Sequence, residues 1–339
     1  MDEKCCPECF NDNGLRRSII PSLEPIKGTC SYCKSENVDI IEPSKLAVFF
    51  EMLINVYEPN EDGKGLVEWM RDDWGLFTHH MDNAHAKELL SEILDDGEIV
   101  RKNYIPSSAY KSEALAQWDT LKDELLYKNR YFLDQQFDTE RLTELLGHLK
   151  AYEIPEEWFR ARIMLSDKSY DIEEMGAPPK RLASHGRANP TGIPYLYLGS
   201  FPETAIAEIR PHTGEKATVA KFKIPEGLIA IDLRNPREHV SPFLLSDASE
   251  IGKMRSDIPF LERLGEELTR PVLPRSAAID YIPSQYLCEF IKKKGFQGVI
   301  YRSSVSHGIN LALFDPTQGK PISITQYNVN CVSVEVSLG

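Results

Sequence analysis

The sequence has no apolar run that approaches the roughly 20 residues of a membrane-spanning helix. Its first residues, MDEKCCPECF, also lack the basic and then apolar order of a secretory signal peptide. These two absences predict a cytoplasmic protein. In the reducing cytoplasm, the seven cysteines are expected to be metal ligands or core residues rather than disulfides.

Positive charge is also scarce, because 39 Lys and Arg residues face 52 Asp and Glu residues, for a net charge of −13. The acidic excess lies mainly in residues 43–150, which hold 12 basic and 21 acidic side chains. Nucleic-acid binding depends on basic side chains that neutralise phosphates, so this balance argues against a nucleic-acid-binding protein. The length of 339 residues is enough for two or three domains.

Residues 1–42 contain two CxxC pairs, Cys6 with Cys9 and Cys30 with Cys33. Four thiolates in two such pairs can surround one zinc ion, which lets a short segment fold without a large core. We therefore predict a zinc-ribbon-like module that holds a structural zinc. Cys5 is an alternative ligand to Cys6. A redox dithiol is the other alternative, although it needs only one of the pairs.

Residues 43–152 show apolar residues at helical spacing, with no alternating strand pattern between them. The predicted helices cover residues 44–57, 65–74, 84–94, 112–132 and 138–152. This pattern predicts an all-helical domain. Arg141 and His148 on its last helix resemble the arginine–histidine motif of HEPN ribonucleases, a pairing that also arises easily by chance.

After a short acidic loop over residues 153–157, the sequence changes from Glu156 onward to short apolar strands and turns rich in Gly and Pro. The predicted strands cover residues 158–165, 195–198, 217–224, 228–233, 298–301, 310–314 and 326–336. Helices are expected from residue 202, over 258–269 and over 284–294. Arg160 and Arg162 alternate along the first strand, which puts both on one face. These residues therefore predict a third domain that mixes strands and helices.

The most unusual stretch is residues 186–211, GRANPTGIPYLYLGSFPETAIAEIRP. Pro190 and Gly192 favour a loop over a helix. Pro202 and Glu203 favour the start of a helix, on which Glu208 is a second carboxylate. We interpret the stretch as a loop, a strand and a helix that together line a pocket.

Four ordered motifs in residues 155–339 resemble the RES-domain family, which is named for an arginine, a glutamate and a serine. They are the arginine strand (FRAR, 159–162), the GR-N-P-x-G-x-P-x-L-Y turn and strand (186–197), the T-A-x-x-E helix (204–208), and the Y-x-S step with its glycine–asparagine turn (301–310). The sequence departs from the family at Ala188, where shorter members often have tryptophan, and at Arg302, where proline is usual.

The resemblance implies a fold similar to that of ADP-ribosyltransferases, a split β-sandwich with helices that grip NAD in a cleft. It also implies a toxin that cleaves the nicotinamide–ribose bond of NAD, by phosphorolysis with inorganic phosphate or by hydrolysis. An Xre-type helix-turn-helix antitoxin would be its partner. Longer members carry a zinc-ribbon-like and HEPN-like N-terminal extension. The whole chain is thus predicted to be a multidomain α+β protein, divided into residues 1–42, 43–152 and 153–339.

Cleavage of this bond develops positive charge on the ribose, which a nearby carboxylate stabilises, while the pyrophosphate needs cationic donors. Glu208, Arg160 and Ser303 are the catalytic residues that we expect. Tyr197 could stack on the nicotinamide ring. Arg162 is an alternative to Arg160, Glu203 to Glu208, and Ser304 to Ser303. The expected NAD-binding residues are Arg160, Arg162, Arg187, Tyr197, Ser303 and Asn310.

Other functions stay open at this point. The same chemistry with a different acceptor gives an ADP-ribosyltransferase that modifies a protein or nucleic acid. A HEPN-type ribonuclease would use Arg141 and His148, with the C-terminal domain as a nucleotide sensor, and a nonenzymatic nucleotide-binding module is the third alternative. The helical domain is expected to gate the cleft, to bind the antitoxin or to form a homo-oligomer.

Overall fold

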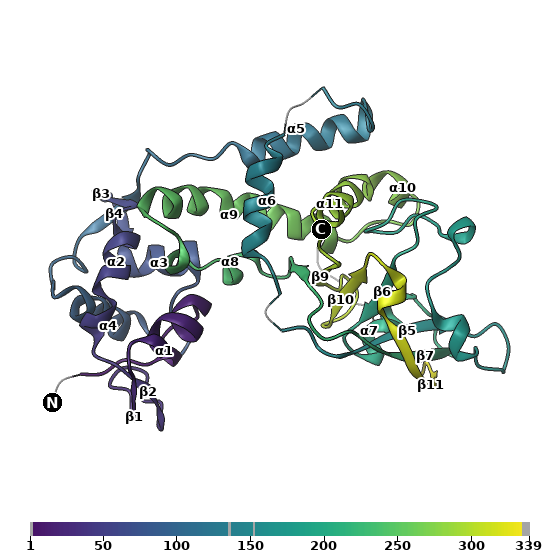
Figure 1. The fold of residues 1–339 in the computed structure, drawn as a ribbon, viewed down its shortest axis with the longest axis horizontal. Coiled ribbons are helices and arrows are strands. Elements are labelled where there is room, and N and C mark those ends of the chain that lie inside the picture. Colours follow the sequence, from purple (N-terminus) through teal and green to yellow (C-terminus); the bar gives the residue numbers. More distant parts are fainter. Residues whose placement is uncertain (1–2, 135–136, 152, 334–339) are drawn as a thin grey trace. The chain divides into compact units, whose positions relative to one another are not determined.

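The computed structural model describes residues 3–134, 137–151 and 153–333, which form two compact units (Figure 1). Unit 1 comprises Met1–Gln117 and Asn235–Glu262, and unit 2 comprises Trp118–Arg234 and Arg263–Gly339. The mixed α+β class predicted from the sequence is confirmed. Within the part of the chain that the structure describes, no helix is both long and apolar enough to cross a membrane.

Unit 1 begins with the cysteine-rich module, in which β1 (Ile26–Gly28) and β2 (Val38–Ile40) form an antiparallel hairpin. A short helix α1 (Ile20–Ser22) precedes the hairpin. Phe10 of this module is wholly buried, and its ring centroid lies 6.0 Å from those of both Phe50 and Phe77. The module therefore shares its apolar core with the helices that follow it.

The prediction that residues 43–152 are all helical is wrong, because β3 (Tyr57–Gly65) pairs antiparallel with β4 (Asn103–Pro106). β3 reads YEPNEDGKG and is mostly solvent-accessible, so it has no alternation of apolar and polar residues to indicate a strand. The helices of this region are α2 (Ala47–Ile54), α3 (Leu66–Trp74), α4 (Asn83–Leu94), α5 (Ala114–Tyr127) and α6 (Thr139–His148).

The second part of unit 1, Asn235–Glu262, comes from within the predicted C-terminal domain. It holds α8 (Pro236–His239) and the first part of α9 (Ala248–Thr269), which begins ten residues before the predicted start at 258. The ring centroids of Phe243 and Phe50 lie 4.9 Å apart. In addition, Ser241 Oγ donates a buried hydrogen bond of 2.9 Å to Asp12 Oδ1. These contacts explain why Asn235–Glu262 belongs to unit 1, although the predicted third domain included it.

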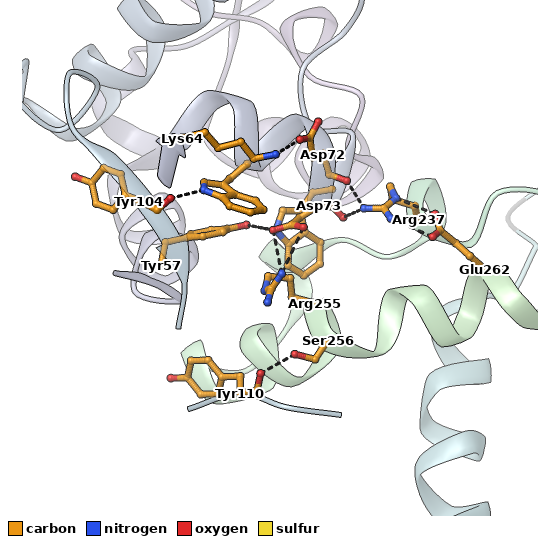
Figure 2. Close-up of polar contacts among 12 residues, drawn as sticks. Tyr57, Lys64, Asp72, Asp73, Tyr104, Tyr110, Arg237, Arg255, Ser256 and Glu262 are labelled. Carbon is orange, nitrogen blue, oxygen red and sulfur yellow. Dashed lines mark hydrogen bonds and ion pairs between the residues drawn. The ribbon is translucent and has the colours of Figure 1, made fainter. Parts of the chain in front are cut away.

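Figure 2 shows the polar contacts that fasten this inserted segment within unit 1. Tyr57 Oη donates to Asp73 Oδ2 at 2.9 Å, and Arg255 pairs with the same carboxylate at 3.4 Å. Burial raises the pKa of Asp73, and the charge of Arg255 opposes that rise. Arg237, which pairs with Glu262 of the same segment at 2.9 Å, donates through Nη1 to the backbone oxygen of Asp73 at 2.8 Å. Because Asp73 is largely buried, removal of Arg255 would leave a carboxylate without its counter-ion.

Unit 2 contains a seven-stranded sheet in the order β11-β7-β5-β6-β10-β9-β8. Its neighbouring strands are antiparallel except β8 and β9. The strand predicted at 326–336 begins at 320 and ends at 328, and residues 334–336 lie outside the described residues. The strands are β5 (Glu157–Ile163), β6 (Leu196–Gly199), β7 (Lys216–Lys223), β8 (Ala230–Asp232), β9 (Gly298–Arg302), β10 (Ile309–Leu313) and β11 (Lys320–Asn328).

The sheet is nearly interrupted between β5 and β6. β5 pairs with β7 over its whole length, and β6 pairs with β10 over its whole length. Within these two fully described strands, however, β5 and β6 share only the Phe159–Gly199 pair. Most of the backbone edge between β5 and β6 is therefore unpaired.

Helix α7 (Pro202–Glu208) packs on β5, β6 and β7 beside this interruption, with Ala205 in a small apolar cluster against Ala161 and Val219. A Cβ atom at Gly199 would lie 2.8 Å from the backbone nitrogen of Ala205, so only glycine allows this close approach. The packing places Glu208 at the last position of α7. Unit 2 also contains α6, most of α5, the end of α9, α10 (Ala277–Asp280) and α11 (Ile282–Lys293).

Candidate active site

A cavity of about 260 Å³ lies at the interruption between β5 and β6. Both strands contribute to its walls, and α7, β9 and β10 complete them. The lining residues are Phe159, Arg160, Ala161, Tyr197, Leu198, Gly199, Ala205, Glu208, Ile209, Tyr301 and Asn310. The loss of strand pairing thus coincides with the opening of a pocket.

Glu208 is the carboxylate of this cavity, and its Oε1 accepts two hydrogen bonds. Ser303 Oγ donates at 2.7 Å and Asn310 Nδ2 donates at 2.6 Å. Both donors are buried, whereas the Glu208 side chain is solvent-exposed. Glu203, its predicted competitor, is exposed in the first turn of α7 and does not line the cavity. The structure therefore brings Glu208 and Ser303 together although they lie 95 positions apart.

Arg160 is the cation of the cavity, and its Nη1 donates to the backbone oxygen of Tyr197 at 3.3 Å. Its Nε is buried and has no hydrogen-bond partner among the described residues. Burial, and then the nearby charge of Arg162, lower the pKa of Arg160 to about 10, so it remains cationic at neutral pH. A buried guanidinium with donors to spare is suited to an anionic ligand.

Arg162 lies outside the cavity lining. Its Nη2 donates to the backbone oxygen of Gly176 at 3.1 Å, and its guanidinium lies 5.7 Å from the Tyr170 ring. The two arginines alternate along β5 as predicted, but only Arg160 stands beside β6. Of the two alternatives, Arg160 is therefore the cavity residue.

Arg187 also lies outside the cavity lining and is held by other groups of unit 2. Its Nη1 donates to the backbone oxygen of Arg270 at 2.7 Å, and its Nη2 donates to Ser304 Oγ at 3.3 Å. Its guanidinium lies 5.1 Å from the ring of Tyr281. Ser304 therefore contacts Arg187, whereas Ser303 contacts Glu208, which separates the two serines that the sequence left as alternatives.

Tyr197 lines the cavity, and hydrogen bonds from the loop before β6 hold its hydroxyl group in place. Its hydroxyl donates to Asn189 Oδ1 at 2.7 Å and accepts from the Ala188 backbone nitrogen at 2.9 Å. Burial raises the pKa of Tyr197, so the phenol stays neutral. Asn189 was not among the predicted site residues, because an asparagine before a proline indicates a turn and not a contact with a tyrosine hydroxyl. Asn189 Nδ2 also donates to the backbone oxygens of Ser184, Pro190 and Ile193.

Tyr301 lines the cavity, and no role in the site was predicted for it from the sequence. It is only 4% exposed, stands opposite Asn310 in the β9–β10 register, and lines the pocket. Burial raises its pKa well above the usual tyrosine value. Tyr301 precedes Ser303 by two residues, so the alternation that predicts Ser303 also places Tyr301 on the same face.

Residues 157–329 match the model of the RES domain family, and this match covers just over half of the chain. The chain belongs to the RES-domain family. The family includes toxins that act on NAD. A similar solved structure is the toxin–antitoxin complex MbcT–MbcA of M. tuberculosis, with 15% sequence identity, a TM-score of 0.31, and coverage of 56% of this chain and 93% of that chain. No curated protein matches the sequence.

Outside the RES domain, the four predicted zinc ligands form one cluster. The sulfur atoms of Cys6, Cys9, Cys30 and Cys33 all lie within 4.8 Å of one another, with separations of 3.4 Å for Cys6–Cys33 and for Cys9–Cys30. A zinc tetrahedron with bonds of about 2.3 Å has sulfur–sulfur edges of about 3.8 Å, so this cluster fits zinc. Cys5 instead forms a β-bridge with Ile41 and is not part of the cluster.

Arg141 and His148, the two residues behind the HEPN hypothesis, lie on α6. Arg141 Nη1 pairs with Glu144 Oε2 at 3.1 Å on the same helix. The HEPN-like domain is not confirmed by this arrangement, and neither residue belongs to the cavity of the RES domain.

Proposed function

We propose that this RES-domain protein is a toxin that consumes NAD by cleaving its nicotinamide–ribose bond, with phosphate or water as the acceptor. The observation that carries the proposal is the Glu208 carboxylate at the cavity, held through one oxygen by Ser303 and Asn310. Positive charge develops on the ribose as the bond breaks. A carboxylate that is already fixed in place stabilises that charge without further reorganisation.

In the proposed reaction, the bond between the ribose carbon and the nicotinamide nitrogen breaks, and its electron pair leaves with the nitrogen. The positively charged pyridinium thereby becomes neutral nicotinamide. An oxygen of inorganic phosphate forms the new bond to the ribose carbon, which gives ADP-ribose phosphate. In hydrolysis a water oxygen forms this bond instead, and the proton that the water loses passes to Glu208 or to solvent.

The other cavity residues have proposed roles in binding NAD. Arg160 would donate to the pyrophosphate, because its guanidinium is cationic and its Nε has no partner within the described chain. The ring of Tyr197 would stack on the nicotinamide. Arg162 and Arg187 already donate to backbone oxygens outside the cavity. We therefore expect them to contribute less to NAD binding than Arg160 does.

The proposal also covers the cysteine-rich module of unit 1 and an antitoxin partner. The cysteine cluster would hold a structural zinc, because four thiolates leave no open coordination position for a substrate. An Xre-type antitoxin would restrain the enzyme, as the membership in a toxin family suggests. The alternative is an ADP-ribosyltransferase, which would break the same bond and transfer the ADP-ribose to a protein or nucleic acid.

The test is incubation of the full-length protein with NAD, with and without inorganic phosphate, followed by mass spectrometry of the products. ADP-ribose phosphate that forms only with phosphate supports phosphorolysis, and ADP-ribose supports hydrolysis. ADP-ribose attached to a protein or nucleic acid supports the transferase alternative. NAD that stays intact in all conditions contradicts the proposed function.

Glu208→Gln is the variant that tests the role of the carboxylate. Glutamine keeps the shape and one acceptor oxygen but removes the negative charge, so NAD consumption should fall by about 1,000-fold, the effect of one unit charge roughly 4 Å from the ribose. Glu203→Gln is the matched control, because Glu203 lies exposed in the first turn of the same helix. Equal losses in both variants would remove Glu208 from its assigned role.

A further inference from the structure

Asn310 lies in the interior of the sheet of unit 2, on β10, and is 4% exposed. Its register partners are Gly199 on β6 and Tyr301 on β9. Two strand pairings therefore fix its backbone. Gly199 has no side chain that could stand between Asn310 and α7, and the Asn310 amide reaches Glu208 at 2.6 Å. Asn310 is thus a rigidly mounted hydrogen-bond donor.

Ser303 is the second donor to the same oxygen of Glu208. Its hydroxyl accepts from the Val305 backbone nitrogen at 3.2 Å and donates to Oε1 at 2.7 Å. Oε2 of Glu208 receives no hydrogen bond from any residue of the described chain. A glutamate at an exposed helix end otherwise has several rotatable bonds, and two donors on one oxygen remove that freedom.

Both donors are also neutral, which matters for the reaction proposed above. A lysine or arginine in either position would hold Glu208 equally well but would offset its negative charge. An amide and a hydroxyl orient the carboxylate and leave its charge available to the developing cation on the ribose.

We propose that Asn310 is a positioning residue, resting on the proposed NAD cleavage: it fixes Glu208 Oε1 so that Oε2 is the oxygen presented to the ribose. This assignment replaces the sequence-based expectation that Asn310 contacts NAD directly. Its effect on the reaction passes through Glu208 alone.

Asn310→Ala is the first test. The loss of one hydrogen bond to a charged group predicts a fall in kcat of about 10- to 100-fold, with KM for NAD changed by less than about threefold. Asn328→Ala is the matched control, because Asn328 is an exposed asparagine at the end of β11 in the same sheet. A rise in KM with unchanged kcat would mean that Asn310 contacts NAD and would overturn the proposal.

Asn310→Asp is the second test, and its readout is the pH profile. The new carboxylate would stand within hydrogen-bond distance of Glu208, and two like charges so close cannot both ionise easily. The two carboxyl groups should therefore titrate in two separated steps, so a limb of the kcat profile should be displaced by at least about one unit in this variant and not in Asn310→Ala. An unmoved limb contradicts direct coupling to Glu208. Ser303→Ala combined with Asn310→Ala should be less than additive, since both donors act on one oxygen.

A crystal structure of the Asn310→Ala protein tests the positioning role of Asn310 independently of whether the protein cleaves NAD. If the wild-type protein leaves NAD intact, the proposed function fails on its own. The positioning role is then judged from the Glu208 side chain, which should leave its wild-type rotamer in the variant. A side chain that keeps the same rotamer and the same bond to Ser303 would refute the positioning role whatever the activity is.

Discussion

Replacement of Phe243 by alanine should destabilise unit 1 strongly, because Phe243 anchors the inserted segment Asn235–Glu262. The side chain is 4% exposed, and its ring centroid lies 4.9 Å from that of Phe50. A truncation of this kind removes a buried aromatic ring and leaves a cavity, which costs about 3–5 kcal/mol. Whole domains are stable by only about 5–15 kcal/mol, so the loss should be large relative to the total.

Urea unfolding followed by circular dichroism and tryptophan fluorescence measures this loss. Leu244→Ala is the matched control, because Leu244 is the next residue but is 51% exposed, and it should change stability by less than about 0.5 kcal/mol. Phe50→Ala combined with Phe243→Ala should show a coupling of about 0.5–1.5 kcal/mol, as expected for rings in contact. A Phe243→Ala effect as small as that of Leu244→Ala, or full additivity with Phe50→Ala, would refute the packing of this segment in unit 1.

The same packing bears on how the protein can be divided. A fragment that begins near residue 151 keeps the inserted segment but lacks the residues of unit 1 that bury it. Its exposed apolar side chains would then favour aggregation. The buried apolar residues of the segment are Val240, Phe243, Ile251, Met254, Ile258, Phe260 and Leu261.

Two further predictions concern unit 1. The four-cysteine cluster is expected to bind zinc, so treatment with a chelator should unfold the cysteine-rich module. Metal analysis should find about one zinc per chain in the wild-type and Cys5→Ser proteins but none in Cys9→Ser. Zinc in Cys9→Ser, or no zinc in Cys5→Ser, would contradict the four-cysteine site. The second prediction concerns Asp12, because burial raises the pKa of its carboxyl group from 3.8 to about 6. The folded protein therefore binds this proton more tightly than the unfolded chain does. The resulting stabilisation of the folded state is fully present below about pH 4 and is lost as the pH rises through about 6. This stabilisation is about 3 kcal/mol. Asn cannot be protonated in this way, so Asp12→Asn should flatten the plot of unfolding free energy against pH between about pH 4 and 6, as measured by urea unfolding. An unchanged slope in the variant would contradict the role of Asp12.

Where strand alternation and motif order act together, the sequence named residues that the structure places at the cavity or in contact with its lining, namely Arg160, Glu208 and Ser303. Alternation places Arg160 on β5, and the ordered motifs place Glu208 at the end of a helix and Ser303 just after β9. These constraints are local, because the position of each residue follows once the helix or strand that carries it has been predicted correctly. The contact between Glu208 and Ser303 then follows from the sheet order, which the sequence pattern does not contain.

The inserted segment and β3 could not be predicted in the same way. The apolar face of α9 has the same periodicity whichever core buries it, so the pattern cannot show that residues 248–262 pack in unit 1. β3 pairs with β4 through its backbone while its polar side chains remain accessible, so it lacks the apolar signal by which strands are found. Asn189 was missed because its contact with the Tyr197 hydroxyl depends on another element, whereas the alternation that predicts Ser303 was already a signal for Tyr301.

The interruption of the sheet also explains why an arginine suits position 160. Opening a cavity between β5 and β6 deprives backbone groups of their usual partners, and unpaired buried carbonyl groups are costly. Arg160 Nη1 supplies one partner by donating to the backbone oxygen of Tyr197. A guanidinium has five N–H donors in a planar arrangement, so it can stabilise this edge and still offer hydrogen bonds to an anion, with Nε among the donors that no described residue uses. A lysine would have only one ammonium group to bind both the Tyr197 carbonyl oxygen and the anion. The residue that stabilises the opened sheet is therefore also the one suited to bind the pyrophosphate of the proposed substrate.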